Sequence, residues 1–222
     1  MNKQIQTFIK EYIEIEKHPR DHRTRNQLMA QLLVRYSDVE QTSFDDLLIL
    51  LDQLKDSQTT IRMPLFAALV YPVLEREIES ENPKAMFILM QHTNLLYKYA
   101  IKQKKQDGYS ERALIKRYLS IVPDDRNVLL RQIKLLSLDL EYALHELPTG
   151  VLYDRDATTP DDCLELLHIL EEYVSTCQKL QIDCSADRRY YAMHFQGYRN
   201  YLLHRSLYNN YLDYIQQHRL ML

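Results

Sequence analysis

Histidines and carboxylates at helical spacing are the first residues of this sequence that could do chemistry. Glu165 and His168 are three residues apart, the spacing at which a glutamate and a histidine ligate the metal pair of di-iron helical bundles. Such a site needs a second copy of the motif and two further glutamates, whereas this sequence has one copy. Glu141 and His145, four residues apart, are equally an ordinary helical ion pair. We therefore expect solvated or hydrogen-bonded histidines, with no metal and no cofactor.

Cysteines are the next residues with chemical potential, and all three, Cys163, Cys177 and Cys184, lie in the last third of the chain. Cys163, Leu170 and Cys177 recur every seven residues, so they share one helical face, where free cysteine packs as a small hydrophobe. No Cys-x-x-Cys pair occurs. We expect core thiols. An odd cysteine count and an N-terminus unlike a secretory signal predict a cytoplasmic protein.

Basic side chains are concentrated around Gly108. They are Lys98, Lys102, Lys104, Lys105, Arg112, Lys116 and Arg117. This cluster could contact phosphates or an acidic partner, with Lys102, Lys105 and Arg112 as the binding candidates. The alternative is two solvated helix ends, where lysines interact favourably with a C-terminal helix dipole. The formal net charge of −3 lacks the overall basic excess of a nucleic-acid binder.

Aromatic side chains form a stripe near the C-terminal end, which we call the tyrosine seam. It advances in alternating steps of four and three residues through Tyr190, His194, Gly197, Tyr201, His204, Tyr208, Tyr211 and Ile215. Tyrosine buries its ring while its hydroxyl finds water or a partner. The seam therefore predicts either packing inside the chain or a surface for another protein, a helical peptide or a second copy. In the second case, the binding residues are Tyr190, His194, Tyr201, His204, Tyr208 and Tyr211.

Within the tyrosine seam lies the segment GYRNYLLHRSLY, residues 197–208. Its Arg199-Asn200-x-x-x-His204 resembles the R-N-x-x-x-H signature of HEPN-domain ribonucleases, which are small, often dimeric helical bundles. The resemblance implies a catalytic pair, Arg199 and His204, supported by Asn200. The histidine would move protons during cleavage by the 2′-hydroxyl of RNA, and the arginine would stabilise charge on the phosphate. Because five residues span roughly 140° on an α-helix, this chemistry needs a helix break near Gly197 or a second chain.

Glycine scarcity excludes several classes of enzyme. Only Gly108, Gly150 and Gly197 occur, and no two of them are close in sequence. Dinucleotide fingerprints, P-loops and nucleophile elbows all need closely spaced glycines. The most apolar stretch, residues 63–74, is too short to span a bilayer, so we expect no membrane contact.

Helices must position all of these residues, because no β-type alternation of side chains is long enough to predict a strand. We predict an all-α fold of about nine helices in antiparallel pairs, forming a helical repeat or an irregular bundle. Ser43, Asn82, Ser110, Asp124 or Asp125, and Thr159 are expected N-caps, as is Thr59 or Thr60. The first expected helix ends before His18, and the fourth is kinked by Pro64 and Pro72. The other expected helices cover residues 21–37, 43–55, 83–106, 110–122, 128–147, 160–180 and 187–218, and the last range is one helix or two.

Prolines mark helix starts at Pro83, Pro123 and Pro160, at intervals of 40 and 37 residues. Such intervals fit helix-pair repeats, in which each unit packs against its neighbours. The segment SERALIKRYLSIVPDD, residues 110–125, resembles the end of a tetratricopeptide repeat, where an amphipathic helix is followed by a proline and acidic residues. This resemblance implies stacked helix pairs.

The chain length of 222 residues allows one domain, 1–222, with a possible subdivision into 1–147 and 160–222 around a loop at 148–159. We expect a non-enzymatic helical protein-interaction module, such as an adaptor or an inhibitor of immunity type. Its partner would bind in a groove between helix pairs or at the tyrosine seam. The alternative is a HEPN-like, metal-independent ribonuclease, the one hypothesis under which nucleic acid is a partner.

Overall fold

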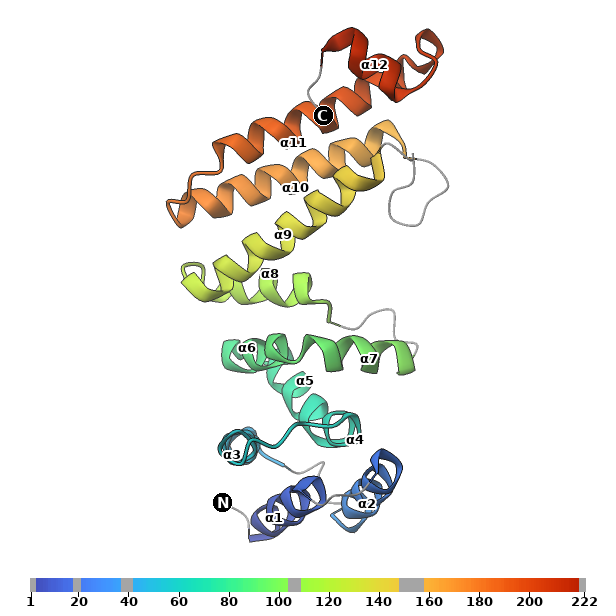
Figure 1. Cartoon of the computed structure of the whole chain (residues 1–222). Coiled ribbons are helices and arrows are strands. Elements are labelled where there is room, and N and C mark those ends of the chain that lie inside the picture. The colour runs from blue at the N-terminus through green and yellow to red at the C-terminus, as the bar shows by residue number, and fades with distance from the viewer. Residues whose placement is uncertain (1–2, 18–20, 37–41, 104–108, 148–157, 220–222) are drawn as a thin grey trace. The chain divides into compact units, whose positions relative to one another are not determined.

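Helices and short turns make up the described part of the chain, and no strand occurs there. The computed structural model describes residues 3–17, 21–36, 42–103, 109–147 and 158–219. Over these residues the chain forms α-helices labelled α1 to α12, with one π-helical and one 3₁₀ segment (Figure 1). The predicted all-α fold is confirmed. The helices outnumber the expected nine because two of the expected helices and the C-terminal tail are each divided.

The chain separates into two compact units, Met1–Val122 and Pro123–Leu222. The sequence placed its candidate boundary later, at the loop 148–159. The helices on the two sides of that loop, α9 (Arg126–Glu146) and α10 (Pro160–Lys179), pack against each other within unit 2. They share one core, to which α9 contributes Leu136 and Leu140.

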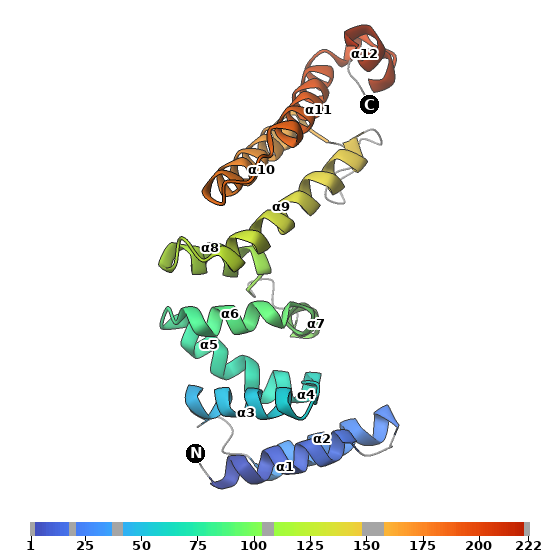
Figure 2. The same ribbon diagram turned by 60° about the vertical axis from the view of Figure 1, so that its left-hand side comes forward.

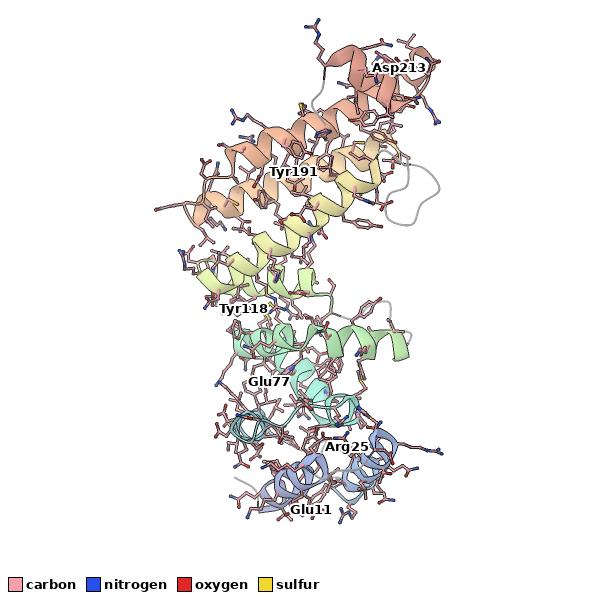
Figure 3. The ribbon with its side chains drawn as sticks, in the orientation of Figure 1. Glu11, Arg25, Glu77, Tyr118, Tyr191 and Asp213 are labelled. Atoms are coloured by element: carbon pink, nitrogen blue, oxygen red, sulfur yellow. The ribbon has the colours of Figure 1, made fainter. Side chains whose placement is uncertain are left out.

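Unit 1 is built from helices that contact others close to them in sequence. Its elements are α1 (Lys3–Lys17), α2 (His22–Arg35), α3 (Phe44–Asp56), α4 (Met63–Leu65), the π-helical η2 (Phe66–Val70), α5 (Tyr71–Glu79), α6 (Pro83–Gln91), α7 (Thr93–Gln103) and α8 (Glu111–Ile121). Helix α1 packs on α2 and α3, α3 on α5, α5 on α6, and α6 on α8. Helices α3 and α6 lie on either side of α5 (Figure 1, Figure 2). Tyr118 of α8 is buried, with its ring centroid 6.2 Å from that of Phe87 on α6 (Figure 3).

Most of the expected N-caps are confirmed. Ser43 accepts a hydrogen bond from the Asp46 amide at 3.2 Å, and Ser110 accepts one from Ala113 at 3.1 Å. At α9 the cap is Asp125, and at α10 Thr159 and Asp162 form a reciprocal capping box. The expected cap at Thr59 or Thr60 is wrong: α4 begins at Met63, and its N-cap residue, Arg62, makes no side-chain cap.

The prolines of unit 1 act as expected on helix geometry. Pro64 lies in the first turn of α4, where its missing N–H removes no helical hydrogen bond. Pro72 follows the π-helical turn η2. A proline ring crowds the carbonyl four residues earlier, and the wider π turn relieves that crowding. The distortion expected from Pro64 and Pro72 is thus present as a π turn between α4 and α5.

The expected helix 83–106 is wrong as a single helix, because it is interrupted at His92. The His92 amide donates to the Leu89 carbonyl at 3.0 Å and ends α6. The His92 carbonyl accepts from the amides of Leu95 and Leu96, both at 2.9 Å, and so begins α7. Neither glycine nor proline marks this break, so no helix-stop signal predicted it.

Unit 2 centres on α10, which packs against both α9 and α11 (Ser185–Leu203). The chain then continues through the 3₁₀ turn η4 (Arg205–Leu207) to α12 (Tyr211–His218). The three cysteines are buried and free, so the expectation of core thiols is confirmed. Burial raises the pKa of Cys163 to about 12 and that of Cys177 to about 11, which keeps both thiols protonated at neutral pH.

Candidate protein-interaction groove

The residues with the ribonuclease-like pattern lie on and just after an unbroken helix. Helix α11 runs through buried Gly197 and through Arg199 to Leu203, so the break required near Gly197 is not present in it. Arg199 is half-buried, and its Nε has no hydrogen-bond partner within the described residues. His204 is exposed at the helix C-cap and donates from Nδ1 to the carbonyl of Asn200 at 2.9 Å. A single chain therefore does not bring Arg199 and His204 together, which leaves a second chain as the route to that site.

The tyrosine seam lies largely in the interior of unit 2. His194, Tyr201 and Tyr211 are buried and Tyr208 is half-buried, whereas Tyr190 and His204 are exposed. The Tyr211 ring lies 5.4 Å from Tyr201 and joins α12 to α11. Tyr190 makes an edge contact with the His194 ring at 4.7 Å. The central seam residues are thus engaged in packing within the chain, and a partner would reach only its two exposed members.

The basic cluster is only partly described. Lys104 and Lys105 lie outside the described residues, and so does the side chain of Lys102. Lys98 on α7 is exposed, and Arg112 on α8 is half-buried. The described part of the cluster therefore does not test the phosphate-binding hypothesis.

The histidine and carboxylate pairs do not assemble into a metal centre in the described part of the chain. There, no group of three or more His, Cys, Asp or Glu side chains is placed to hold an ion. Glu165 and His168 are both exposed on α10. His145 pairs with its neighbour Glu146, with Nδ1 3.1 Å from Oε1, rather than with Glu141.

A groove in unit 1 is the site that the sequence analysis did not locate. It encloses about 680 Å³ between α3 and α6. Helix α3 lines it with Leu48, Leu51, Asp52, Leu54 and Lys55, and α6 lines it with Lys84, Phe87, Ile88 and Gln91. Residues 59–61, His92 and Leu95 complete the lining.

The two groove helices contribute differently to the groove. On α3, Leu47, Leu50 and Leu54 are buried, while Leu48 and Leu51 remain half-exposed as a second apolar stripe. On α6, the groove residues 84, 87, 88 and 91 share one helical face, on which Phe87 is half-exposed, Ile88 is buried, and the other two are polar and exposed. Helix α5 packs against both α3 and α6. These faces of α3 and α6 line an open groove.

Apolar side chains from both walls line the groove, and its charged side chains are Asp52, Lys55 and Lys84. Lys55 lies in the last turn of α3, Lys84 lies in the first turn of α6, and both side chains are exposed. Neither ammonium group makes a hydrogen bond or ion pair with a described residue. Burial lowers the pKa of His92 below its usual value, so this imidazole is neutral at pH 7. The result is an apolar channel between two unpaired lysines.

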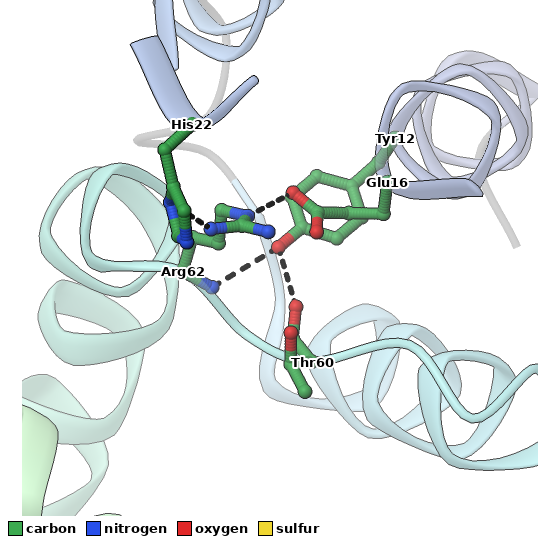
Figure 4. Close-up of polar contacts among 5 residues, drawn as sticks. All are labelled: Tyr12, Glu16, His22, Thr60 and Arg62. Atoms are coloured by element: carbon green, nitrogen blue, oxygen red, sulfur yellow. Dashed lines mark hydrogen bonds and ion pairs between the residues drawn. The ribbon is translucent and has the colours of Figure 1, made fainter. Parts of the chain in front are cut away.

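A partly buried polar network fixes the loop that lines part of the groove (Figure 4). The Tyr12 hydroxyl on α1 donates to the Thr60 carbonyl at 2.8 Å and accepts from the Arg62 amide at 3.1 Å. The Arg62 guanidinium pairs with Glu16 through Nε, and its Nη1 lies 3.1 Å from His22 Nδ1. Burial raises the pKa of Tyr12 and keeps its hydroxyl protonated. Helix α1 thus holds the loop in place.

The sequence contained one signal for the groove that went unused. The α3 segment FDDLLILLDQLKD has leucines at 47, 48, 50, 51 and 54, more than one buried face of a helix can accommodate. The excess predicts a second apolar contact for this helix. The α6 wall gave a weaker signal, because the break at His92 was not expected.

Comparison of the chain with protein-family models, with curated proteins and with solved structures finds no match. Among the described helices, none is long and apolar enough to cross a membrane. The function is therefore argued from the groove itself.

Proposed function

We propose that this protein is a helical protein-interaction module that binds a segment of a partner protein in the groove between α3 and α6. The observation that carries the proposal is a groove of about 680 Å³ that is lined by the half-exposed Leu48 and Leu51 of α3 and by Phe87 and Ile88 of α6. Binding pockets are typically about 300–1,000 Å³ with a mostly apolar lining. Protein interfaces combine an apolar centre with a polar rim, which is the distribution found in this groove.

The order of helices in unit 1 supports this proposal. The first helices of successive pairs begin at Lys3, Phe44 and Pro83, at intervals of 41 and 39 residues. Helix α1 contacts α3, and α2 contacts α4, so equivalent helices of adjacent pairs pack together. Helix-pair repeats use the surface formed by successive equivalent helices to bind partners. We propose that α3 and α6 are two such helices in a short repeat array.

Affinity capture with matched variants tests the proposed function. Tagged full-length protein is compared with Leu51→Asp, which places a carboxylate in the groove, and with Val34→Asp. Val34 is 77% exposed on α2 in the same unit and does not line the groove, so it is the control for loss of an exposed apolar side chain. We expect a partner that is captured by the wild type and by Val34→Asp and is lost with Leu51→Asp.

Circular dichroism must show that each variant has the helix content of the wild type before its capture is compared. Leu51→Ala serves as a milder second variant. Capture that is equal for the wild type and both Leu51 variants would contradict the proposed groove. Loss with Val34→Asp alone would place the binding surface on α2.

A further inference from the structure

The groove also indicates what kind of partner segment it accepts. Resting on the proposed function, we infer that the occupant is an amphipathic helix of a partner protein, with acidic side chains on both sides of its apolar stripe. The juxtaposition behind this inference is an apolar channel with Lys55 on one side and Lys84 on the other.

A helical occupant follows from the backbone of the groove. Its walls are helices, whose backbone donors and acceptors are mostly paired internally, and the described residues contain no strand with a free edge. An extended segment would find few backbone partners here, whereas a helix satisfies its own. The wall from Leu48 to Lys55 rises about 10 Å, which matches roughly two turns of a bound helix.

Acidic flanks follow from the charges at the groove edges. Both lysines are exposed and lack ion pairs with described residues, whereas Asp52 is the one carboxylate in the lining. With two lysines and one aspartate, the lining has a positive balance even though His92 is neutral at pH 7. Lys84 also lies in the first turn of α6, where the helix dipole is already positive. A carboxylate bound between Lys84 and this helix end interacts favourably with both the ammonium group and the positive end of the helix dipole.

Selection from a peptide library tests the inference without a known partner. Random peptides of about 18 residues, long enough for roughly five helical turns, are displayed on phage and panned against the full chain. Binders retained by Leu51→Asp are removed, so that the remaining peptides depend on the groove. We expect them to carry large apolar residues at i, i+3 or i+4 and i+7, flanked by Asp or Glu.

Charge reversal then tests the two lysines directly. For a selected acidic peptide, we expect K55E/K84E to weaken binding about tenfold or more at low salt, with the difference shrinking at high salt. The control is K10E/K134E, which makes the same change in net charge at two exposed lysines outside the groove and outside the basic cluster. Peptides with Lys or Arg in the flanks should show the reverse preference.

The outcomes separate this inference from the proposed function. Groove-dependent peptides that are neutral or basic, or that bind K55E/K84E as well as the wild type, would overturn the acidic partner while the groove still binds. Groove-dependent peptides without helical spacing would overturn the helical occupant. Failure to select any peptide that depends on Leu51, together with affinity capture unaffected by Leu51→Asp, would overturn both.

Discussion

The groove of unit 1 and the tyrosine seam of unit 2 start from the same kind of sequence and end in opposite environments. Both use helices with more apolar or aromatic residues than one buried face requires. In unit 2, the rings of Tyr198, Tyr201 and Tyr211 pack where α12 lies against α11, with the Tyr198 and Tyr211 centroids 4.6 Å apart. In unit 1, the stripes at Leu48, Leu51 and Phe87 remain partly open. What differs is whether another element of the chain covers these side chains.

The largest expected contrast is in stability. Phe195→Ala should destabilise unit 2 by about 3–5 kcal/mol, because Phe195 is fully buried and truncation leaves a cavity. Leu51→Ala should cost about 1 kcal/mol or less, because Leu51 is partly exposed and its removal leaves no closed cavity. Urea denaturation followed by circular dichroism measures both. Equal destabilisation would mean that the groove stripe is part of the core of unit 1.

Two buried hydroxyls should respond differently to removal. Tyr12→Phe should destabilise the protein by about 1–3 kcal/mol, since it leaves the Thr60 carbonyl and the Arg62 amide without their partner. The Tyr211 hydroxyl is buried and has no hydrogen-bond partner among the described residues. Tyr211→Phe should therefore be neutral or stabilising by up to about 1 kcal/mol. The same denaturation experiment applies, and a marked loss with Tyr211→Phe would contradict the packing described for the tyrosine seam.

Acid should weaken the protein through His92. Burial lowers the pKa of His92 in the folded state below its ordinary 6.5, so the unfolded chain binds the proton more readily. The stability that neutral His92 contributes is fully present above pH 6.5, and it is lost as the pH falls through the lowered pKa of His92 in the folded state. His92→Gln should reduce the slope of stability against pH below pH 6.5. His168→Gln, at an exposed position, is the control for loss of an imidazole.

The smallest expected effect concerns RNA. We expect the purified chain to show no RNA cleavage that depends on Arg199 or His204, because α11 holds the two side chains on diverging faces. A fluorogenic RNA assay with Arg199→Ala and His204→Ala measures this at concentrations that span any dimerisation. Turnover that is abolished by either substitution would establish the ribonuclease alternative and make the exposed part of the tyrosine seam a catalytic surface.

Local signals in the sequence predicted much of the fold. Side-chain caps such as Ser43 and Thr159 act over three residues, and their helix starts were predicted correctly. Apolar periodicity likewise predicted buried Cys163 and Cys177. By contrast, Thr60 was expected to cap a helix because its type suits that role. Its carbonyl instead accepts from Tyr12, 48 residues away, which is a contact that no local pattern contains.

The candidate site was harder to predict than the fold because it depends on which apolar side chains the other helices leave uncovered. The sequence analysis anticipated a groove between helix pairs as one of two partner surfaces, without its residues. Periodicity can identify a second stripe at Leu48 and Leu51, but the neighbours of that stripe are set by α5 and by the break at His92. The same limitation applied to the tyrosine seam, where the sequence left both packing and binding open for Tyr201 and Tyr211.

The hydrogen bonds of Tyr12 make the first helix a determinant of a site to which it contributes no lining residue. A fragment that begins after Lys17 would retain both groove helices and every lining side chain, yet the loop of residues 59–62 would lose its anchor. Proteolytic trimming of this terminus, or an expression boundary chosen to remove it, would therefore disturb the proposed binding groove while every residue that lines it stays intact. The length of chain needed to hold the groove exceeds the length that lines it.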